Sequence, residues 1–376
     1  MTCVDAPGTP ARAQAAVRRV DPGIMPSFPR AVRSLSLAGL LAVAVAGGAA
    51  SSGTEPVAAA VPSAAPDRTW HVSASAAAGG IGTAARPFAG VQPGLDAARP
   101  GDTVLVHPGR YVGTVRTVRG GVAGRPVVLR GLPGAVLSGT SPRHDRLLTV
   151  GHDWVVVTGF TLTTADKGVW LQHAAHVVVR GNRITGMGGE CVRVKYLSRH
   201  NEVSGNTIGP CGLVGYTGRD GHKNGEGVYV GTAPEQLDRN PTPVPDTSDD
   251  NLVRGNVIRV VAECVDVKES ARRTLVERND CAGGIDPKGG GISSRGDRSV
   301  IRYNTVRDYA GKGVRLGGDE PGQGVLNDVY GNSLRRTGGH AVGAMRMPQG
   351  RVCGNAVGEN AAGVVNVVLP VTAPCP

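Results

Sequence analysis

The stretch NLVRGNVI, residues 251–258, is one of seven copies of a pattern in which an asparagine stands between two runs of mostly β-branched residues. The intervals between successive asparagines are 24, 50, 23, 25, 28 and 23 residues. The seven asparagines are Asn182, Asn206, Asn256, Asn279, Asn304, Asn332 and Asn355. A period in the twenties is typical of stacked coils that bury their apolar faces against their neighbours. We expect the asparagines to stack inside a turn, and the 50-residue interval to hold an extra full coil with a loop.

A second strand pattern recurs between these asparagines. Its copies are KGVWLQ (167–172), ECVRVK (190–195), EGVYVG (226–231), ECVDVK (263–268), GGISSR (290–295) and KGVRLG (312–317). Side chains alternate along a strand, so we expect inward-facing residues and two outward columns. The inward residues are Val192, Val194, Val265, Val267, Val314 and Leu316. One outward column holds Trp170, Arg193, Tyr229, Asp266, Ser293 and Arg315, and the other holds Gln172, Lys195, Gly231, Lys268, Arg295 and Gly317. Glu190, Glu226 and Glu263 form an acidic column at the strand entry.

Composition favours the same architecture. The chain has 57 glycines and only 3% aromatic residues, which disfavours a helical bundle and suits short strands joined by tight turns. The predicted fold class is all-β, a single-stranded right-handed parallel β-helix of about nine to eleven coils. A short helical stretch at Val91–Ala98 would cap the open N-terminal end of the apolar core. We expect one β-helix domain over residues 67–376.

Residues 1–66 form a predicted leader. Met25 is followed by Arg30 and Arg33, an apolar run from Leu35 to Ala46, and then small residues, which is the order of a secretory signal peptide. We expect residues 1–24 to lie upstream of the true start of the protein. The apolar run is too short to span a membrane. We therefore expect a secreted, extracellular protein with no membrane span.

The net charge of +11 is compatible with an anionic partner or with a merely soluble basic surface. We expect the chain to bind no nucleic acid and to be a monomer.

Seven cysteines are present, and Cys3 lies in the leader. An even number in an exported chain favours disulfides, and six cysteines allow 15 pairings. Close spacing in neighbouring turns favours Cys191–Cys211, Cys264–Cys281 and Cys353–Cys375.

The opening segment resembles secreted pectin-lyase-like β-helix proteins. The resemblance rests on the string from Pro87 to Tyr111, PFAGVQPGLDAARPGDTVLVHPGRY, together with the asparagine repeat. It covers residues 70–360 and implies the β-helix fold, whereas function must be argued from the site.

The string ECVDVKES, residues 263–270, is similar to one in the alginate lyase and chondroitinase B type of calcium-assisted polysaccharide lyases, in which an arginine follows one coil later. That resemblance implies Lys268 as the catalytic base, Arg295 as acid or charge stabiliser, and Glu263 as a calcium ligand. It also implies an anionic polysaccharide as the partner. The family has a second glutamate where this chain has Val261. Glu226, Asn224 or Asp266 would have to replace it as a ligand.

Physical chemistry supports the same reaction. Elimination across C4–C5 of a uronate removes a proton beside a carboxylate, whose charge calcium or arginine must neutralise. A lysine beside another cation has a lowered pKa and becomes a usable base, which we expect for Lys268. Arg193, Lys195, Trp170, Tyr229 and Arg315 are the candidate substrate-binding residues. The insertions at 212–225 and 233–250 would build walls beside them.

Two other functions fit the same residues. The outward cations are also compatible with an ordinary solvated ladder, on a non-catalytic β-helix that binds glycans or acts at the cell surface. Asp266 and Glu263 could instead be paired carboxylates of a glycoside hydrolase.

Overall fold

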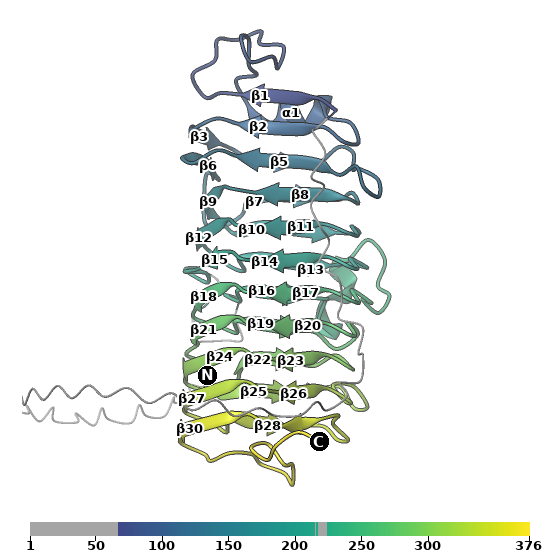
Figure 1. Ribbon diagram of the computed structural model, residues 1–376, viewed down its shortest axis with the longest axis vertical. Helices are drawn as coiled ribbons and strands as arrows, with labels where there is room; N and C mark the ends of the chain where they lie inside the picture. The colour runs from purple at the N-terminus through teal and green to yellow at the C-terminus, as the bar shows by residue number, and fades with distance from the viewer. Residues whose placement is uncertain (1–66, 215, 217–223) are drawn as a thin grey trace, which may run out of the picture. The chain divides into compact units, whose positions relative to one another are not determined.

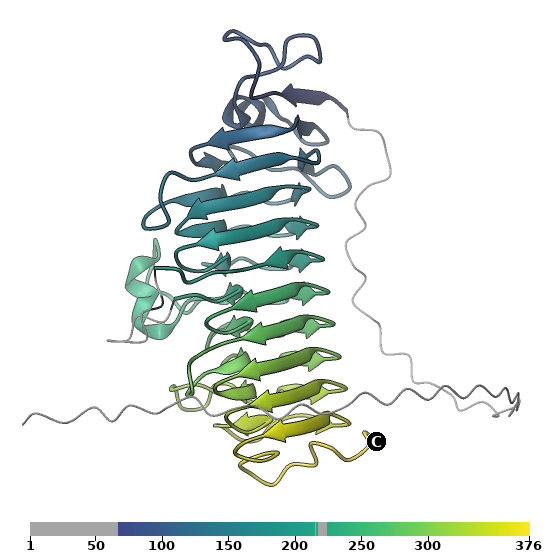
Figure 2. The ribbon, with the colours of Figure 1, turned by 90° about the vertical axis from the view of Figure 1, so that its left-hand side faces the viewer.

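A computed structural model describes residues 67–214, 216 and 224–376. The described chain winds into about ten turns of a parallel β-solenoid (Figures 1 and 2), which confirms the predicted parallel β-helix. Each turn contributes strands to three parallel sheets. The predicted signal peptide and leader lie outside the described residues.

The first sheet has 11 strands. They are β1 (Thr69–Val72), β2 (Thr103–Val106), β5 (Val127–Gly131), β8 (Val155–Thr158), β11 (Val178–Arg180), β14 (Glu202–Ser204), β17 (Leu252–Arg254), β20 (Leu275–Glu277), β23 (Val300–Arg302), β26 (Asp328–Tyr330) and β29 (Val352–Cys353). The second sheet has 10 strands. They are β3 (Gly109–Val112), β6 (Ala135–Ser138), β9 (Thr161–Ala165), β12 (Arg183–Met187), β15 (Thr207–Ile208), β18 (Val257–Val260), β21 (Asp280–Gly283), β24 (Thr305–Tyr309), β27 (Ser333–Thr337) and β30 (Ala356–Asn360).

The third sheet has nine strands and carries the predicted site. They are β4 (Val115–Arg116), β7 (Arg146–Val150), β10 (Lys167–Gln172), β13 (Val192–Lys195), β16 (Val228–Val230), β19 (Val265–Val267), β22 (Gly290–Ser294), β25 (Lys312–Leu316) and β28 (Val342–Ala344).

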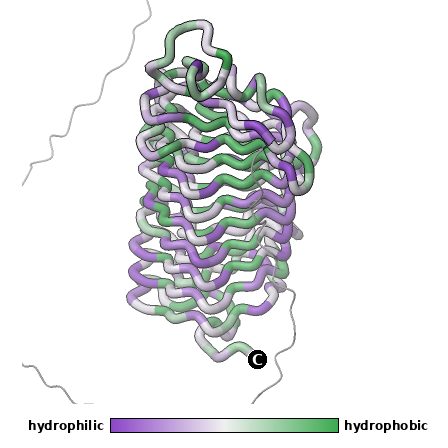
Figure 3. The backbone as a smooth tube through the Cα atoms, turned by 45° about the horizontal axis from the view of Figure 1, so that its top comes forward, coloured by the Kyte–Doolittle hydropathy of each residue, from purple (hydrophilic) through white to green (hydrophobic). Residues whose placement is uncertain are grey.

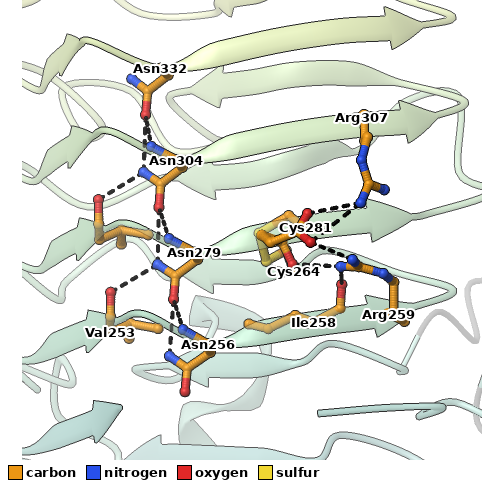
Figure 4. Close-up of a disulfide and its surroundings, with 12 residues drawn as sticks. Val253, Asn256, Ile258, Arg259, Cys264, Asn279, Cys281, Asn304, Arg307 and Asn332 are labelled. Carbon is orange, nitrogen blue, oxygen red and sulfur yellow. Dashed lines mark hydrogen bonds and ion pairs between the residues drawn. A yellow bond between two sulfur atoms is a disulfide. The ribbon is translucent and has the colours of Figure 1, made fainter. Parts of the chain in front are cut away.

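The repeat asparagines form a continuous ladder at the turn between the first and second sheets (Figure 4). The side-chain oxygen of Asn279, for example, accepts hydrogen bonds from the backbone N–H and the side-chain amide of Asn256, at 3.0 and 2.9 Å. Its own amide donates to the Val253 carbonyl and to Asn304. The ladder thus satisfies backbone groups that burial would otherwise leave unpaired.

The 50-residue interval is a single enlarged coil, so the expected extra coil is wrong. The backbone N–H of Asn206 donates directly to the Asn256 side chain at 2.9 Å. Strands β14 and β15 accordingly pair with β17 and β18. The additional residues form two insertions, one on each side of β16. Insertions can project from the solenoid without disturbing the stacked coils. The number of residues between two repeat asparagines therefore does not by itself give the number of coils between them.

The core lies inside the coils. Hydrophobic and hydrophilic residues alternate along the backbone (Figure 3). The predicted inward residues of the third sheet are all buried, with exposures of 0–1%. Parallel pairing of neighbouring coils places like residues above one another, so Val194, Val230 and Val267 form one apolar column.

Both ends of the core are covered. Helix α1 (Val91–Ala97) lies at the N-terminal end, as predicted, with Val91 and Leu95 buried. A Cβ on Gly94 would stand 2.7 Å from Val104, so glycine permits the close approach of the helix to β2. At the other end Val371 is 2% exposed, and its carbonyl accepts from Asn355, the last residue of the ladder.

All three predicted disulfides are present: Cys191–Cys211, Cys264–Cys281 (Figure 4) and Cys353–Cys375. The third ties the C-terminal tail to β29. Within the described ranges, no helix is long and apolar enough to cross a membrane.

Candidate active site on the third sheet

The outward columns predicted from the sequence are in register. Tyr229 pairs with Asp266, Asp266 with Ser293, and Ser293 with Arg315. Lys268 and Arg295 follow their strands directly, and their backbone N–H groups continue the parallel ladder to Val230 and Val267. The inward valines of β19 fix the outward direction of Asp266 and Lys268 by alternation.

Asp266 lies at the centre of the charged groups. Its carboxylate accepts a hydrogen bond from Lys268 Nζ at 2.5 Å, and Arg295 Nη2 lies 3.6 Å from the same oxygen. Arg295 Nη1 also lies 3.6 Å from Glu269. All four side chains are largely buried, so their charges interact more strongly than they would in water.

These contacts shift the pKa of Lys268 in the direction opposite to the one expected from the sequence. Burial lowers the pKa of Lys268, but the Asp266 carboxylate and other neighbours outweigh burial, and the net pKa is raised. The pKa of Asp266 is lowered, because Lys268 and Arg295 outweigh its own burial. The expected depression of the Lys268 pKa by a neighbouring cation is therefore wrong. Stacking of neighbouring coils predicts the contact of Lys268 with Arg295, but the Asp266 side chain, two residues earlier on the same strand, has the larger effect on the Lys268 pKa.

Three of the four proposed calcium ligands come together. Ligand oxygens of Glu226, Glu263 and Asp266 all lie within 4.8 Å of one another. Burial, then neighbouring carboxylates including Glu190, raises the pKa of Glu226 to about 8. Burial and Asp266 likewise raise the pKa of Glu263. The fourth proposed ligand, Asn224, lines the same cleft.

The donor set of this acidic trio, Glu226, Glu263 and Asp266, fits a hard divalent cation. Calcium prefers several carboxylate oxygens, and the trio offers them on one side of the cleft. Among the described residues, Asp266 Oδ1 is buried without a hydrogen-bond partner, as an oxygen awaiting a ligand would be.

Tyr229 lies between two cations. The Arg193 guanidinium is 4.0 Å and the Lys268 ammonium 4.4 Å from its ring centroid. The side chain is 2% exposed, and its hydroxyl finds no hydrogen-bond partner within the described part of the chain. Burial raises the pKa of Tyr229 to about 12, although both cations act in the opposite direction.

Three predicted substrate-binding residues are covered. Trp170, Arg193 and Lys195 are 5, 6 and 4% exposed. The Arg146 guanidinium lies 4.0 Å from the Trp170 ring centroid. Arg193 donates to Glu190 at 2.5 Å, and burial, then Arg193, lowers the pKa of Lys195 to about 8.

The remaining predicted residues line one cleft of about 530 Å³. They are Asn224, Glu226, Tyr229, Glu263, Asp266, Lys268, Arg295 and Arg315. Eight further residues line the cleft. Glu235 and Gln236 belong to the 233–250 insertion, which the sequence predicts to form a wall, and the six that the sequence did not single out are Asp286, Pro287, Lys288, Lys312, Asp319 and Met345. Lys312 begins a copy of the strand repeat and could have been found there. Gln236 lies in an insertion that carries no periodic signal.

Comparison with known protein structures agrees with the fold. An alginate lyase from Paenibacillus sp. str. FPU-7 superposes with a TM-score of 0.64 and 25% identity, covering 80% of this chain and 99% of that one. The pectate lyase Pel9A superposes with a TM-score of 0.53 and 14% identity, covering 81% and 79%. No family model matches the sequence, and no curated protein matches it. The chain therefore has the parallel β-helix fold that these polysaccharide lyases share, as the sequence resemblance implied.

Proposed function

We propose that this protein is a secreted polysaccharide lyase that cleaves a uronate-containing polysaccharide by β-elimination. The observation that carries the proposal is the composition of the cleft floor. Lys268, Arg295 and Tyr229 lie there beside the acidic trio. The structural similarity to an alginate lyase supports a substrate of the same chemical class. The three disulfides are compatible with secretion.

The first requirement is to neutralise the uronate carboxylate. Arg295 and Lys268 are both cations, since their pKa values are raised. Arg295 presents a planar fork that can bind a carboxylate with two hydrogen bonds. Calcium bound by the trio would supply a Lewis acid for the same carboxylate and make the neighbouring C5 proton easier to remove.

The second requirement is a pair of proton transfers. A lysine held as a cation by Asp266 can donate a proton but cannot accept one, so we assign Lys268 as the acid that protonates the departing glycosidic oxygen. Tyr229, whose hydroxyl has no other partner in the described structure, is assigned as the base that takes the C5 proton. The C4–O4 bond then breaks, and a C4–C5 double bond forms.

The test is a panel of alginate, pectate and glycosaminoglycan, each incubated with protein treated with a chelator and with protein supplied with Ca²⁺. A lyase produces ultraviolet absorbance from the new double bond, and we expect this signal with at least one uronate polymer. New reducing ends without absorbance would instead establish a hydrolase.

A glycan-binding protein without activity is the second candidate. The Lys268–Asp266 ion pair favours it, because this pair holds the Lys268 ammonium in a buried contact. Retention of a uronate polymer without either product would establish it.

A further inference from the structure

The insertion after β16 folds back over the preceding coil. Its residue Asp246 is 1% exposed and accepts hydrogen bonds from the backbone N–H groups of Tyr196 and Leu197, at 2.6 and 2.8 Å. The same carboxylate accepts from the hydroxyls of Thr232 and Ser248. The insertion is therefore fixed to the coil that contains β13. Figure 2 shows this segment projecting from the side of the solenoid at mid-height.

A short 3-10 helix in this insertion, η1 (Pro234–Arg239), covers the outward face of β13. The side-chain oxygen of Gln236 accepts a hydrogen bond from Arg193 Nη2 at 2.9 Å. Arg193 and Lys195 point outward from the third sheet, yet each is no more than 6% exposed. The row of outward side chains is thus covered on the N-terminal side of Tyr229.

In the other direction the cleft continues. Its lining runs from Tyr229 past Arg295 and Arg315 to Met345, just beyond the last strand of the third sheet. Met345 is 44% exposed, so that end is open. Lys288 and Lys312 add positive charge along this stretch, and together with Arg295 and Arg315 these four cations outnumber its two carboxylates, Asp286 and Asp319. The cleft therefore has one closed end, at Gln236, and one open, cationic end.

We infer that the cleft takes the terminus of an anionic polysaccharide chain, with η1 as the stop, and that elimination proceeds from the chain end rather than at internal bonds. The inference rests on the proposed function. The terminal sugars lie against Gln236, and the rest of the polymer leaves over Lys312 and Arg315. Each turnover moves the C5 proton to deprotonated Tyr229, breaks one C4–O4 bond, transfers a proton from Lys268 to the departing O4, and releases a short fragment without consuming water.

The experiment compares the loss of polymer viscosity with the formation of double bonds. The wild-type protein should lose viscosity slowly per double bond and release only short products from the first time points. Shortening residues 235–244 to a glycine linker, with Thr232 and Asp246 retained, should open the closed end. That variant should lose viscosity several-fold faster per double bond. Long fragments early in the wild-type reaction would overturn the inference.

A matched pair of point variants guards against misfolding of the shortened chain. Gln236→Ala removes the contact to Arg193 and should shift products toward longer fragments, whereas Gln236→Glu keeps an acceptor for Arg193 and should preserve short products. Identical products from the two variants and the wild type would count against η1 as the stop.

Failure of the proposed function is distinguishable from failure of this inference. If no double bond forms with any polymer, the lyase proposal fails, and calorimetric titration with uronate oligomers of increasing length still tests end binding. One protein bound per chain at every length supports binding at the terminus. A number of bound proteins that grows with chain length, or no binding, overturns it.

Discussion

Variants of Lys268, which is paired with Asp266, can distinguish a lyase from a protein that only binds the polymer. Lys268→Ala should reduce kcat by about 10²–10⁴-fold, the usual contribution of a positioned acid or base. Lys268→Arg keeps the positive charge beside Asp266 but donates its proton far less readily, so it should retain polymer affinity and still lose turnover. Both are measured by double-bond formation and by retention of the polymer. Full activity in Lys268→Arg would show that only its charge matters.

Tyr229 supplies the predicted dependence on pH. Its pKa of about 12 leaves it protonated at neutral pH, and a base must be deprotonated. We therefore expect kcat/KM to rise with pH from neutral toward alkaline conditions, within the range in which the fold persists. Tyr229→Phe should remove most of the activity, and the residual rate should lack this rise. Retained activity in Tyr229→Phe would contradict its assignment as base.

At the scale of the element, the asparagine ladder is the main local support of the coils. Asn279→Ala removes the partner of the Asn256 backbone N–H and of the Val253 carbonyl, both inside the solenoid. Each buried group left unpaired costs about 1–3 kcal/mol, so the loss of both partners should lower the free energy of unfolding by about 2–6 kcal/mol. Denaturant titration measures it. Thr207→Ala, at an exposed position of β15, serves as the control and should change stability little.

The strands also show which features of the site the sequence could reveal. Alternation along β19 and β22 places Asp266, Lys268 and Arg295 on one face because their valine and isoleucine neighbours must be buried. The acidic trio follows from the same register, since Glu226 and Glu263 enter consecutive strands. The pKa of Lys268 was predicted in the wrong direction, because column neighbours were considered and the residue two positions earlier on the same strand was not.

At the scale of the whole molecule, occupation of the acidic trio should stabilise the fold. A ligand that binds only the folded state at about 100 times its dissociation constant adds about 2.7 kcal/mol. We expect added Ca²⁺ to raise the thermal unfolding temperature and a chelator to reverse the change.

Glu263→Gln should abolish the calcium response while raising stability in the absence of metal, because it removes one of three crowded buried carboxylates. Glu235→Gln, elsewhere on the cleft wall, should keep the response. An unchanged unfolding temperature in the wild type would argue against the trio as a metal site.

The whole-molecule organisation also explains why part of the site escaped prediction. A sequence repeat predicts which strands pair between neighbouring coils. The parallel β-helix, its capping helix and its disulfides could therefore be predicted from the sequence. The insertion that contains Gln236 and Asp246 is not part of the repeat, so it has no equivalent segment in a neighbouring coil. Its path over Arg193 depends on side-chain hydrogen bonds that no sequence period encodes, and it covers part of the surface that the sequence predicts to bind substrate.

The enlarged coil has a consequence for how such a chain can change. Asn206 and Asn256 are hydrogen-bonded as closely as Asn256 and Asn279, which are only 23 residues apart. The chain can therefore be longer at the junctions before and after β16 without changing the distance between neighbouring coils. Segments of very different length can be exchanged there without altering the stack. These two junctions are therefore natural positions for grafting loops, and recombination at them would diversify the substrates of a solenoid while sparing its scaffold.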